Sequence, residues 1–460
     1  MQNSSCIDCY SENVKNLNIQ ITKSKKLITY LSVARLLTFV VFVTFLALYI
    51  FQKPINLFLG SSLVGFLSFL FVVKFDLSLV SKLKLLENKF ALNKGELRYL
   101  KHDFDDQHPG DEYKILNPHL VDDFDIFGKA SLFQYLNRCF TKLGKDKFAK
   151  NLCQSELDGE VILKNQAAIK ELSEKNDFIQ DFQAQAMLVS ERGNELVNLQ
   201  AWLDEPVSKL RFLKIASVVF PLISCLWIAA VVFGPFTLSS LLLPILLNML
   251  IVGSNKKLIN SAHSHLGKSS SVLKKYAVLI KLMEEESFES SYLSDFKKQL
   301  FLQNLKASQV LKSLSRLLNT FDLRFNWIVS LTLNALFLFD VQILFQLNKW
   351  KEKHKQFIPN WFSVLSKVEP LISFAVFAFN NKSYISYPEV LDSDFKFKAQ
   401  AMGHPLLSPS VRINNTVDFG GTPCVNIITG ANMAGKRTFL RTVSLSIVMA
   451  NIGLPVCATS

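Results

Sequence analysis

This 460-residue chain has few cysteines, no recognisable spacing of metal ligands and no evident secretion signal, and each of these features argues against a class of protein. The seven cysteines are odd in number and scattered, so they do not form the framework of a disulfide-stapled secreted domain. Cys6 and Cys9 make one C-x-x-C pair, but a zinc site of that kind needs a second pair, and none is apparent. No secretory signal is evident, because the first apolar run begins well inside the chain and no small-residue cleavage site follows it.

Charged residues are also few, at 19% of the chain, whereas apolar residues make up 49% and the mean hydropathy is +0.23. The length leaves room for two or three domains, and this balance indicates long apolar runs rather than one enlarged core. The charges that are present sum to +13, with a pI near 9.2. This basic excess suits an anionic partner, either nucleic acid or the inner face of a membrane. The other interpretation is that the lysines simply flank membrane segments.

Four apolar runs lie at 36–51, 55–73, 215–233 and 237–253. A helix needs about 20 apolar residues to cross the hydrocarbon core of a bilayer, and each run is close to that length. The breaks at 52–54 and 234–235 contain proline and separate each pair by a tight turn. Because unpaired backbone is not tolerated in lipid, the pattern predicts four transmembrane helices in two hairpins.

Basic residues set the orientation of both predicted hairpins. They gather before and after each hairpin, whereas the two short turns hold only Lys53. By the positive-inside rule, both hairpins should begin and end in the cytosol. A soluble helical bundle is the other interpretation, but it leaves the flanking charge unexplained. The flanking residues are Lys23, Lys25, Lys26, Arg35, Lys74, Lys82, Lys84, Lys209, Arg211, Lys214, Lys256 and Lys257.

A fifth apolar stretch, 327–339, is too short to span a bilayer. It carries polar residues such as Ser330 and Asn334 and then meets Asp340. We therefore predict a helix in the core of the cytosolic part.

The rest of the chain is mainly helical in pattern up to Tyr384, with apolar residues three and four apart, as in the leucine stripe of 305–318. The segment 102–125 is acidic, but its carboxylates show no recurring ligand spacing, so a solvated loop is expected rather than a metal site. After Tyr384, proline and glycine punctuate short β-prone pieces, among them 395–398. This change predicts a domain boundary near 385–395.

A phosphate-binding loop is the motif that carries chemistry. Cys424–Thr429 is expected to be a buried strand, and 437–450 is expected to be a helix. Between them, loop N–H groups and the helix N-terminus would point at the phosphates of a nucleotide, and Lys436 would reach the β- and γ-phosphates. The candidate nucleotide-binding residues are Gly430, Ala431, Asn432, Met433, Ala434, Gly435, Lys436, Arg437 and Thr438.

The pattern G-x-x-x-x-G-K-[S/T] fails at its last position, where Arg437 stands. That position normally supplies a hydroxyl to Mg²⁺. Thr438 is one residue later and turned by about 100° on a helix, so it does not fill the same place. A guanidinium pairs with phosphate, so nucleotide binding is expected to survive while metal-dependent hydrolysis suffers. No residue is therefore assigned a catalytic role or a metal ion.

The loop 428–436 resembles that of the MutS family, which places Asn and Met inside it and follows it with Ser-Thr-x-Leu-Arg. Thr438, Leu440 and Arg441 match that helix start, and Arg437 departs from it. The chain is also similar to the family in four other places. These are Gly403-His-Pro-Leu-Leu407, Ala450-Asn-Ile-Gly-Leu-Pro-Val-Cys-Ala458, the approach 369–388, and, more weakly, 127–172 with Gly144 and Asn165 to Leu172.

The resemblance implies ATP-gated DNA binding by a homodimer whose composite sites take the phosphate loop from one subunit and a signature segment from the other. The carboxylate strand that helps to hold Mg²⁺, the signature segment and the dimerising end would lie beyond Ser460, so the ATPase domain is expected to be incomplete. The N-terminal mismatch-reading domain of the family and the nuclease domain of some relatives find no counterpart here.

The expected fold class is two α-helical membrane hairpins plus a MutS-like helical core, followed by the incomplete α/β P-loop (ABC-type) ATPase domain. The predicted parts are a cytosolic segment 1–35, hairpin 36–73, helical core 74–210, hairpin 211–253, helical core and lever 254–388, and ATPase part 389–460.

These observations predict a MutS-like, ATP-binding and DNA-binding protein on the cytosolic face of a bacterial inner membrane, with hydrolysis impaired by Arg437. Mg²⁺ is expected from the resemblance alone. One alternative is a membrane structural or regulatory protein that uses a degenerate nucleotide-binding domain for interactions, another is a transporter with an ABC-like domain, and a third is an incomplete gene product. DNA preference and the purpose of the anchor do not follow from the sequence.

Overall fold

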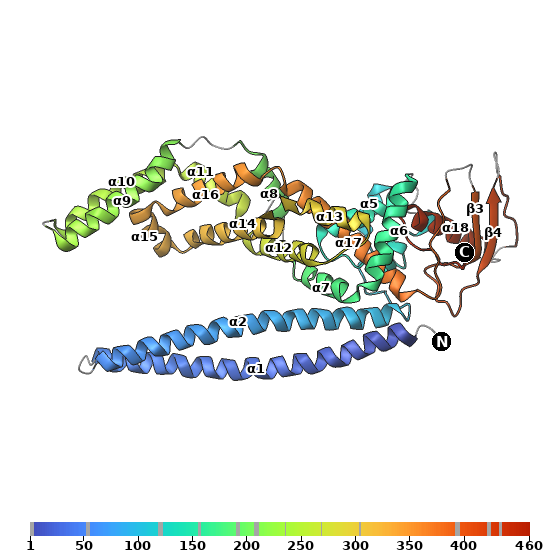
Figure 1. The fold of residues 1–460 in the computed structure, drawn as a ribbon, viewed down its shortest axis with the longest axis horizontal. Helices are drawn as coiled ribbons and strands as arrows, with labels where there is room; N and C mark the ends of the chain where they lie inside the picture. Colours follow the sequence, from blue (N-terminus) through green and yellow to red (C-terminus); the bar gives the residue numbers. More distant parts are fainter. Residues whose placement is uncertain are drawn as a thin grey trace. The chain divides into compact units, whose positions relative to one another are not determined.

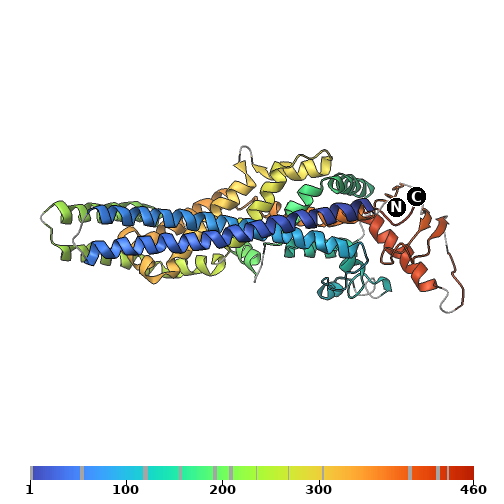
Figure 2. The ribbon, with the colours of Figure 1, turned by 90° about the horizontal axis from the view of Figure 1, so that it is seen from below.

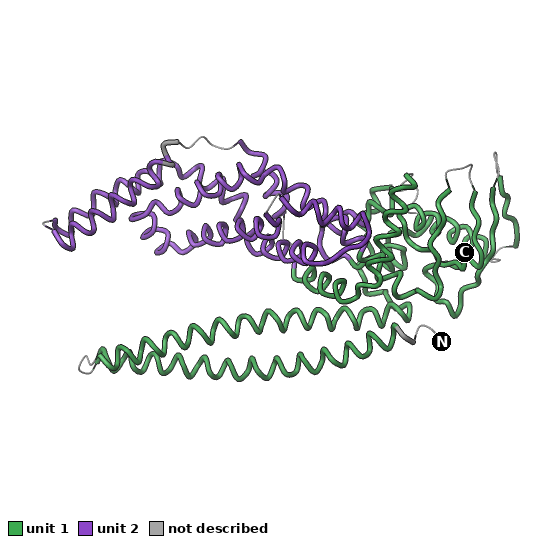
Figure 3. Tube along the Cα trace, in the orientation of Figure 1, with its two compact units in different colours: residues 1–138, 149–188, 372–460 green, residues 139–148, 189–371 purple. Residues whose placement is uncertain are grey.

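Helices make up most of the described chain. The computed structural model describes residues 4–51, 56–117, 123–154, 158–189, 194–206, 211–234, 236–267, 269–302, 305–391, 396–420, 425–431 and 435–460. The chain divides into two compact units (Figure 3). Unit 1 contains 1–138, 149–188 and 372–460, and unit 2 contains 139–148 and 189–371.

The first hairpin belongs to unit 1 and consists of α1 (Ser4–Phe51) and α2 (Asn56–Tyr99), which lie side by side (Figures 1 and 2). Aromatic rings join their apolar halves, and the ring centroids of Phe42 and Phe66 are 5.2 Å apart. Gly65 permits this approach, because a Cβ there would lie 3.1 Å from the Phe42 Cα. The apolar half of the hairpin is thus held by interlocking aromatic and small side chains.

An ion pair marks the end of this apolar half, where Arg35 Nη1 lies 3.1 Å from Asp76 Oδ2. Beyond it both helices continue without a break. The described part of the predicted segment 1–35 and the first part of the predicted segment 74–210, up to Tyr99, are therefore continuations of the two apolar helices rather than separate elements. The reason is local, since neither proline nor glycine follows the apolar run of α2 until Gly95.

Unit 1 also holds the two strands and the helix that follow the predicted domain boundary. β3 and β4 pair in antiparallel register from Lys396↔Gly420 to Met402↔Asn415, so the predicted β-prone piece at 395–398 is a strand from Lys396 onward. The remaining elements are η1 (Asp111–Leu116), α4 (Leu132–Leu136), α6 (Gly159–Glu174), α7 (Asn176–Ala186), β3 (Lys396–Met402), β4 (Asn415–Gly420) and α18 (Lys436–Asn451).

Unit 2 is helical apart from a short β-ribbon. Its elements are α8 (Glu195–Asp204), α9 (Arg211–Phe233), η2 (Leu238–Leu241), α10 (Leu242–Ser254), α11 (Lys256–Leu266), α12 (Ser270–Glu285), α13 (Ser291–Gln299), β1 (Phe301–Leu302), β2 (Leu305–Lys306), α14 (Ala307–Phe321), η3 (Asp322–Phe325), α15 (Trp327–Phe337) and α16 (Phe339–His354). Two further helices, α5 (Lys142–Cys153) and α17 (Ile358–Asn380), contribute residues to both units.

The predicted apolar stripe of α14 is confirmed over most of its length. Val310, Leu311, Leu314 and Leu318 are buried on the face that packs against α12, whereas Leu305 lies in β2 and is exposed. Leu317, also part of the predicted stripe, is only half-buried, so the spacing identified the core face for four of the five predicted positions inside the helix.

The prediction of a core helix at 327–339 is wrong. α15 ends at Phe337, and its outer side is exposed, with Trp327 73% exposed. Its inner side packs against α9 and α10, where the buried Asn248 amide donates to the Ala335 carbonyl at 2.7 Å. Leu338 then adopts a left-handed conformation, and α15 and α16 meet at 83°. The stretch is apolar because it lies along an apolar hairpin, not because it fills a core.

Among the residues that the structure describes, four helices are long and apolar enough to cross a membrane: Cys6–Phe51, Asn56–Tyr99, Ile215–Phe233 and Ile358–Asn380. The first three contain predicted runs. The fourth is different, because 72% of its most apolar window is buried inside the protein, and it serves as a core helix. The predicted run 237–253 is divided between η2 and α10, and α10 meets α11 at a bend of 60°.

Candidate functional site

The predicted phosphate loop leads into α18 in unit 1. The helix runs from Lys436 to Asn451, which confirms the helix expected at 437–450. Gly435 caps it with φ 81°, a left-handed conformation that favours glycine. A Cβ there would meet no atom within 4 Å, so the backbone conformation alone requires glycine. Three other predicted site residues, Asn432, Met433 and Ala434, lie outside the described residues.

The expectation of a buried strand at Cys424–Thr429 is wrong for the residues that the structure describes. Residues 425–430 form an exposed, irregular segment, and the Val425 and Ile427 side chains are each 84% exposed. A buried strand needs hydrogen-bonded neighbours and covered faces. In the described part of the chain, β3 and β4 pair only with each other, so residues 425–430 belong to no sheet there.

Lys436 closes the loop, because its Nζ donates to the Gly430 carbonyl at 2.6 Å. An ammonium group and the free N–H groups of the first turn of α18 thus lie at the same end of the helix, an arrangement that favours an anion such as phosphate. Arg437 and Thr438 are exposed, as is Ala431. The guanidinium at position 437 suits phosphate, whereas the site lacks a hydroxyl at the position that Mg²⁺ would require. The residues present therefore fit a nucleotide's phosphates and do not fit Mg²⁺.

One turn further along, Arg441 fixes α18 to the acidic segment that the sequence predicted to be a solvated loop. Arg441 Nη1 forms an ion pair with Asp125 Oδ2, and its Nε donates to the Asp123 carbonyl at 3.2 Å. Asp125 has a left-handed backbone, and its carbonyl accepts from the Leu132 N–H at the start of α4. The Arg441 and Asp125 side chains are 36% and 42% exposed, so this ion pair is consistent with the solvated loop that the sequence predicted. No local pattern marks this pair, although Arg441 itself belongs to the motif.

Two histidines near this contact are kept neutral by their surroundings. Burial, together with the Arg441 charge, lowers the pKa of His404 below its usual range. Burial, together with the Arg412 charge, lowers the pKa of His102 in the same way. Protonation of either imidazole would therefore place a charge in a buried and already cationic region.

Segments that carry the resemblance and are far apart in sequence meet around the end of α18. The Gly403 N–H donates to the Cys457 carbonyl at 2.7 Å, and the Asn165 amide donates to the Ile452 carbonyl at 3.3 Å. Gly453 has φ 83°, and a Cβ there would lie 2.5 Å from the Asn165 Cβ. The glycine is thus required both by its conformation and by the approach of α6.

A buried polar cluster lies where α1, α2 and α17 converge with the α4–α5 connection. Arg138 and Glu96 form a two-pronged ion pair, with Nε–Oε1 at 3.1 Å and Nη2–Oε2 at 3.2 Å. The Asn380 amide donates to Glu96 Oε2 at 2.7 Å and accepts from the Tyr10 hydroxyl at 2.9 Å. The guanidinium also covers the Tyr99 ring at 3.5 Å from its centroid. The cluster ties the polar end of the first hairpin to α17.

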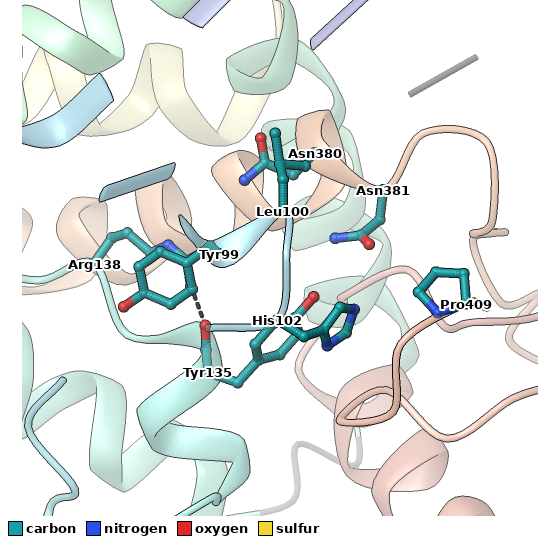
Figure 4. Close-up of a pocket in the computed structure, with 8 residues that line it drawn as sticks. All are labelled: Tyr99, Leu100, His102, Tyr135, Arg138, Asn380, Asn381 and Pro409. Carbon is teal, nitrogen blue, oxygen red and sulfur yellow. Dashed lines mark hydrogen bonds between the residues drawn. The ribbon is translucent and has the colours of Figure 1, made fainter. Parts of the chain in front are cut away.

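Figure 4 shows Tyr99, Arg138 and Asn380 of this cluster among the residues that line a small cavity of about 10 Å³, close to the space that one water molecule needs. Burial disfavours the charge of Arg138, but Glu96 reverses that effect and raises the pKa of the guanidinium. Burial raises the pKa of Tyr99 to about 12 and that of Tyr10 well above its ordinary value. Tyr10 and Tyr99 therefore stay neutral at neutral pH, which suits a structural joint better than proton transfer.

A second buried carboxylate, in unit 2, caps α5. Glu369 Oε1 accepts from the Phe140 N–H at 2.6 Å and from the Thr141 N–H at 3.0 Å, and Oε2 accepts from the Thr141 hydroxyl. Burial raises the pKa of Glu369 despite these donors. A Cβ at Gly144 would lie 2.0 Å from Glu369 Oε2, so glycine is needed for the close approach of α5 and α17.

The C-x-x-C pair has structural contacts. Cys6 Sγ donates to the Phe379 carbonyl at 3.5 Å, and Cys9 Sγ accepts from the Asn176 amide at 3.9 Å. Burial raises the pKa of both thiols. Within the described ranges, no three His, Cys, Asp or Glu side chains come together to hold a metal ion.

Sequence comparison relates the chain to mismatch-repair proteins. It is 28% identical to the DNA mismatch repair protein MutS of Streptococcus mutans over 123 residues, which cover 26% of this chain and 14% of that protein. It is 34% identical to MutS of Caldanaerobacter subterraneus over 99 residues, 21% of this chain and 11% of that protein.

A eukaryotic relative gives the same picture. The chain is 34% identical to the DNA mismatch repair protein spellchecker 1 of Drosophila melanogaster over 94 residues, 19% of this chain and 10% of that protein. No protein-family model matches the chain. The matches establish a distant relationship to MutS, and each spans only a small part of the relative's length.

Proposed function

We propose that this chain is a membrane-anchored, MutS-like protein that binds ATP through residues 430–438. One observation carries the proposal: in a chain distantly related to MutS, a left-handed Gly435 caps α18, and Lys436 folds onto the Gly430 carbonyl. Phosphate oxygens would replace that carbonyl as acceptors for the Lys436 ammonium and would take the free N–H groups of the first turn.

Arg437 determines what kind of nucleotide site this is. Its guanidinium would add a second cation and form two hydrogen bonds to a phosphate. Because no hydroxyl stands at that position, binding should not depend on Mg²⁺, and hydrolysis should be weak or absent. The proposed activity is therefore nucleotide-dependent gating rather than rapid turnover.

DNA and membrane are the proposed partners, and the bacterial inner membrane is the proposed location. The relatives are mismatch-repair proteins, and the charge of +13 suits contacts with DNA phosphates. Three apolar helices, α1, α2 and α9, together with α10, would anchor the chain with its polar parts in the cytosol. A second copy of the chain is a further proposed partner, on the basis of the resemblance.

Nucleotide binding by the full chain in lipid nanodiscs tests the proposal. A fluorescent ATP analogue should bind the parent equally with Mg²⁺ or with EDTA. Lys436→Ala should weaken binding by roughly 10- to 100-fold, the loss of one charge-assisted hydrogen bond. Lys398→Ala, an exposed lysine on β3, should change nothing. Equal affinity of the two variants would refute the proposal.

Arg437→Ser separates binding from metal dependence. The substitution restores the hydroxyl, so Mg²⁺ should now raise the affinity, while turnover should stay absent. Rapid ATP hydrolysis by the parent would contradict this account of Arg437.

The second candidate is a membrane structural or regulatory protein that uses a degenerate nucleotide-binding domain as an interaction module. Arg437 and the exposed segment 425–430 favour it. DNA binding by the full chain discriminates between the two candidates. Affinity for duplex DNA that falls steeply with salt supports the first, whereas no DNA binding at low salt supports the second.

A further inference from the structure

A cationic groove lies between α14 and α16 in unit 2, away from the candidate nucleotide segment in unit 1. The two helices pack against each other and leave an open depression of about 430 Å³. Leu317 and Trp350 form its floor, and Trp350 is 7% exposed. The Trp350 indole donates to Ser313 Oγ at 2.9 Å, which fixes the ring in place. The floor is therefore apolar and preformed.

The rim of the groove carries Arg316, Lys349 and Lys353, and no acidic residue lines it. None of these three cations forms an ion pair with the described residues, unlike Lys281 in the same unit, which lies 3.4 Å from Glu285. Three uncompensated cations around an apolar floor disfavour one another and favour an anion with an apolar portion.

The position of the groove along α16 relates it to the second hairpin, which is also in unit 2. The Gln342 amide donates to the Ser217 carbonyl at 3.4 Å, so the first turn of α16 lies level with the beginning of α9. At 1.5 Å per residue, Gln346, Lys349 and Lys353 follow at roughly 6, 10 and 17 Å from that level. A bilayer's polar zone is about 6 Å deep on each side of its hydrocarbon core, so Gln346 lies at its outer edge, the Lys349 side chain is long enough to reach it, and Lys353 lies beyond it.

The surface between hairpin and groove is apolar. Leu323, Phe325, Trp327 and Ile328 in η3 and α15 are exposed. Apolar side chains with a tryptophan, followed by a belt of cations, form the pattern found at membrane interfaces. The exposed apolar side of α15 would be unfavourable in contact with water, and it fits an element that lies against lipid.

We propose that the α14–α16 groove binds the headgroup phosphate of an anionic phospholipid, with its glycerol end against Leu317 and Trp350. The inference rests on the proposed membrane location and concerns a different region from the nucleotide segment. Nucleic acid phosphate is the competing occupant, but its backbone offers no apolar group to contact Leu317 and Trp350. The site would anchor unit 2 to anionic lipid at a defined depth.

Native mass spectrometry of the detergent-purified full chain measures lipid binding directly. Phosphatidylglycerol should bind more tightly than phosphatidylcholine. The triple variant Arg316→Gln, Lys349→Gln, Lys353→Gln should lose on the order of 100-fold in that affinity, at about fivefold per basic side chain. The control triple Lys274→Gln, Lys312→Gln, Lys355→Gln removes the same charge from nearby exposed positions and should change it less than about threefold.

Three outcomes would overturn the proposal: equal loss in both triple variants, displacement of the lipid by inorganic phosphate, or equal competition by a short duplex oligonucleotide. The membrane location is tested separately by carbonate extraction of cell membranes. A chain released by carbonate, with groove-dependent lipid binding intact, would refute the location and leave the site standing.

Discussion

Breaking the Glu96–Arg138 pair should loosen the joint between the first hairpin and α17. Glu96→Leu would leave a buried guanidinium without its counterion and the Asn380 amide without its acceptor. Arg138→Met would leave a buried carboxylate. Each single change should lower the free energy of opening at this joint by about 3–5 kcal/mol, which is the penalty for an unpaired buried charge. The double variant should cost less than either single change, because no charge then stays buried, and the magnitude of the coupling energy should therefore exceed about 3 kcal/mol.

Hydrogen exchange of the full chain in detergent gives the free energy of opening at the polar end of α2 and at the end of α17. The partly exposed pair Lys25–Glu87, which joins α1 to α2 at 3.0 Å, serves as the control, and Lys25→Met should change that free energy by less than about 1 kcal/mol. Additive effects of the two single changes, or effects as small as the control, would refute the assignment of the pair as a structural joint.

Three further predictions concern buried groups. Gly144→Ala should destabilise α5 by about 2–4 kcal/mol, measured by thermal unfolding, because its Cβ meets the Glu369 carboxylate. Glu369→Gln should be tolerated within about 1.5 kcal/mol, since its amide oxygen still accepts both N–H groups, whereas Glu369→Ala should cost about 3–5 kcal/mol. Because the pKa values of His102 and His404 are lowered in the folded protein, their stabilising contribution is present above about pH 6.5 and is lost as the pH falls through the folded values. Limited proteolysis near residue 404 should therefore accelerate on acidification, and His404→Gln should reduce that pH dependence.

Local patterns predicted the helices well. The stripe of α14 and the helix after Gly435 follow from spacing and capping that a few neighbouring residues determine. The apolar runs of the first hairpin and of α9 were recognisable because their length exceeds what a core helix needs. Composition alone did not separate α17 from these, and only its burial identifies it as a core helix.

Features that depend on distant partners could not be predicted. The segment 424–429 has a strand's composition, but a strand exists only where a neighbour pairs with it. α15 is apolar because it packs against the hairpin of α9 and α10. The spacing of apolar residues in 327–339 does not reveal that partner. The Glu96–Arg138 and Arg441–Asp125 pairs join residues 42 and more than 300 positions apart, and no motif announces either. The sequence therefore identified the glycine and the lysine of the candidate site, but not the contacts that hold the site in place.

The unbroken helix α2 fixes the distance between the apolar half of the first hairpin and the buried cluster at Glu96. Glu96 lies twenty residues after Asp76, where the apolar half of the hairpin ends, so the two are separated by roughly 30 Å along one rigid helix. With the apolar half embedded in a bilayer, the rigid polar half of the hairpin would hold the end of α17 and the nucleotide segment at a fixed distance from the lipid. Removing the same number of whole turns from both helices would shorten that distance while leaving the joint at Glu96 untouched. The distance between the lipid and the nucleotide segment is thus a property that evolution can adjust without changing the residues proposed to bind the nucleotide.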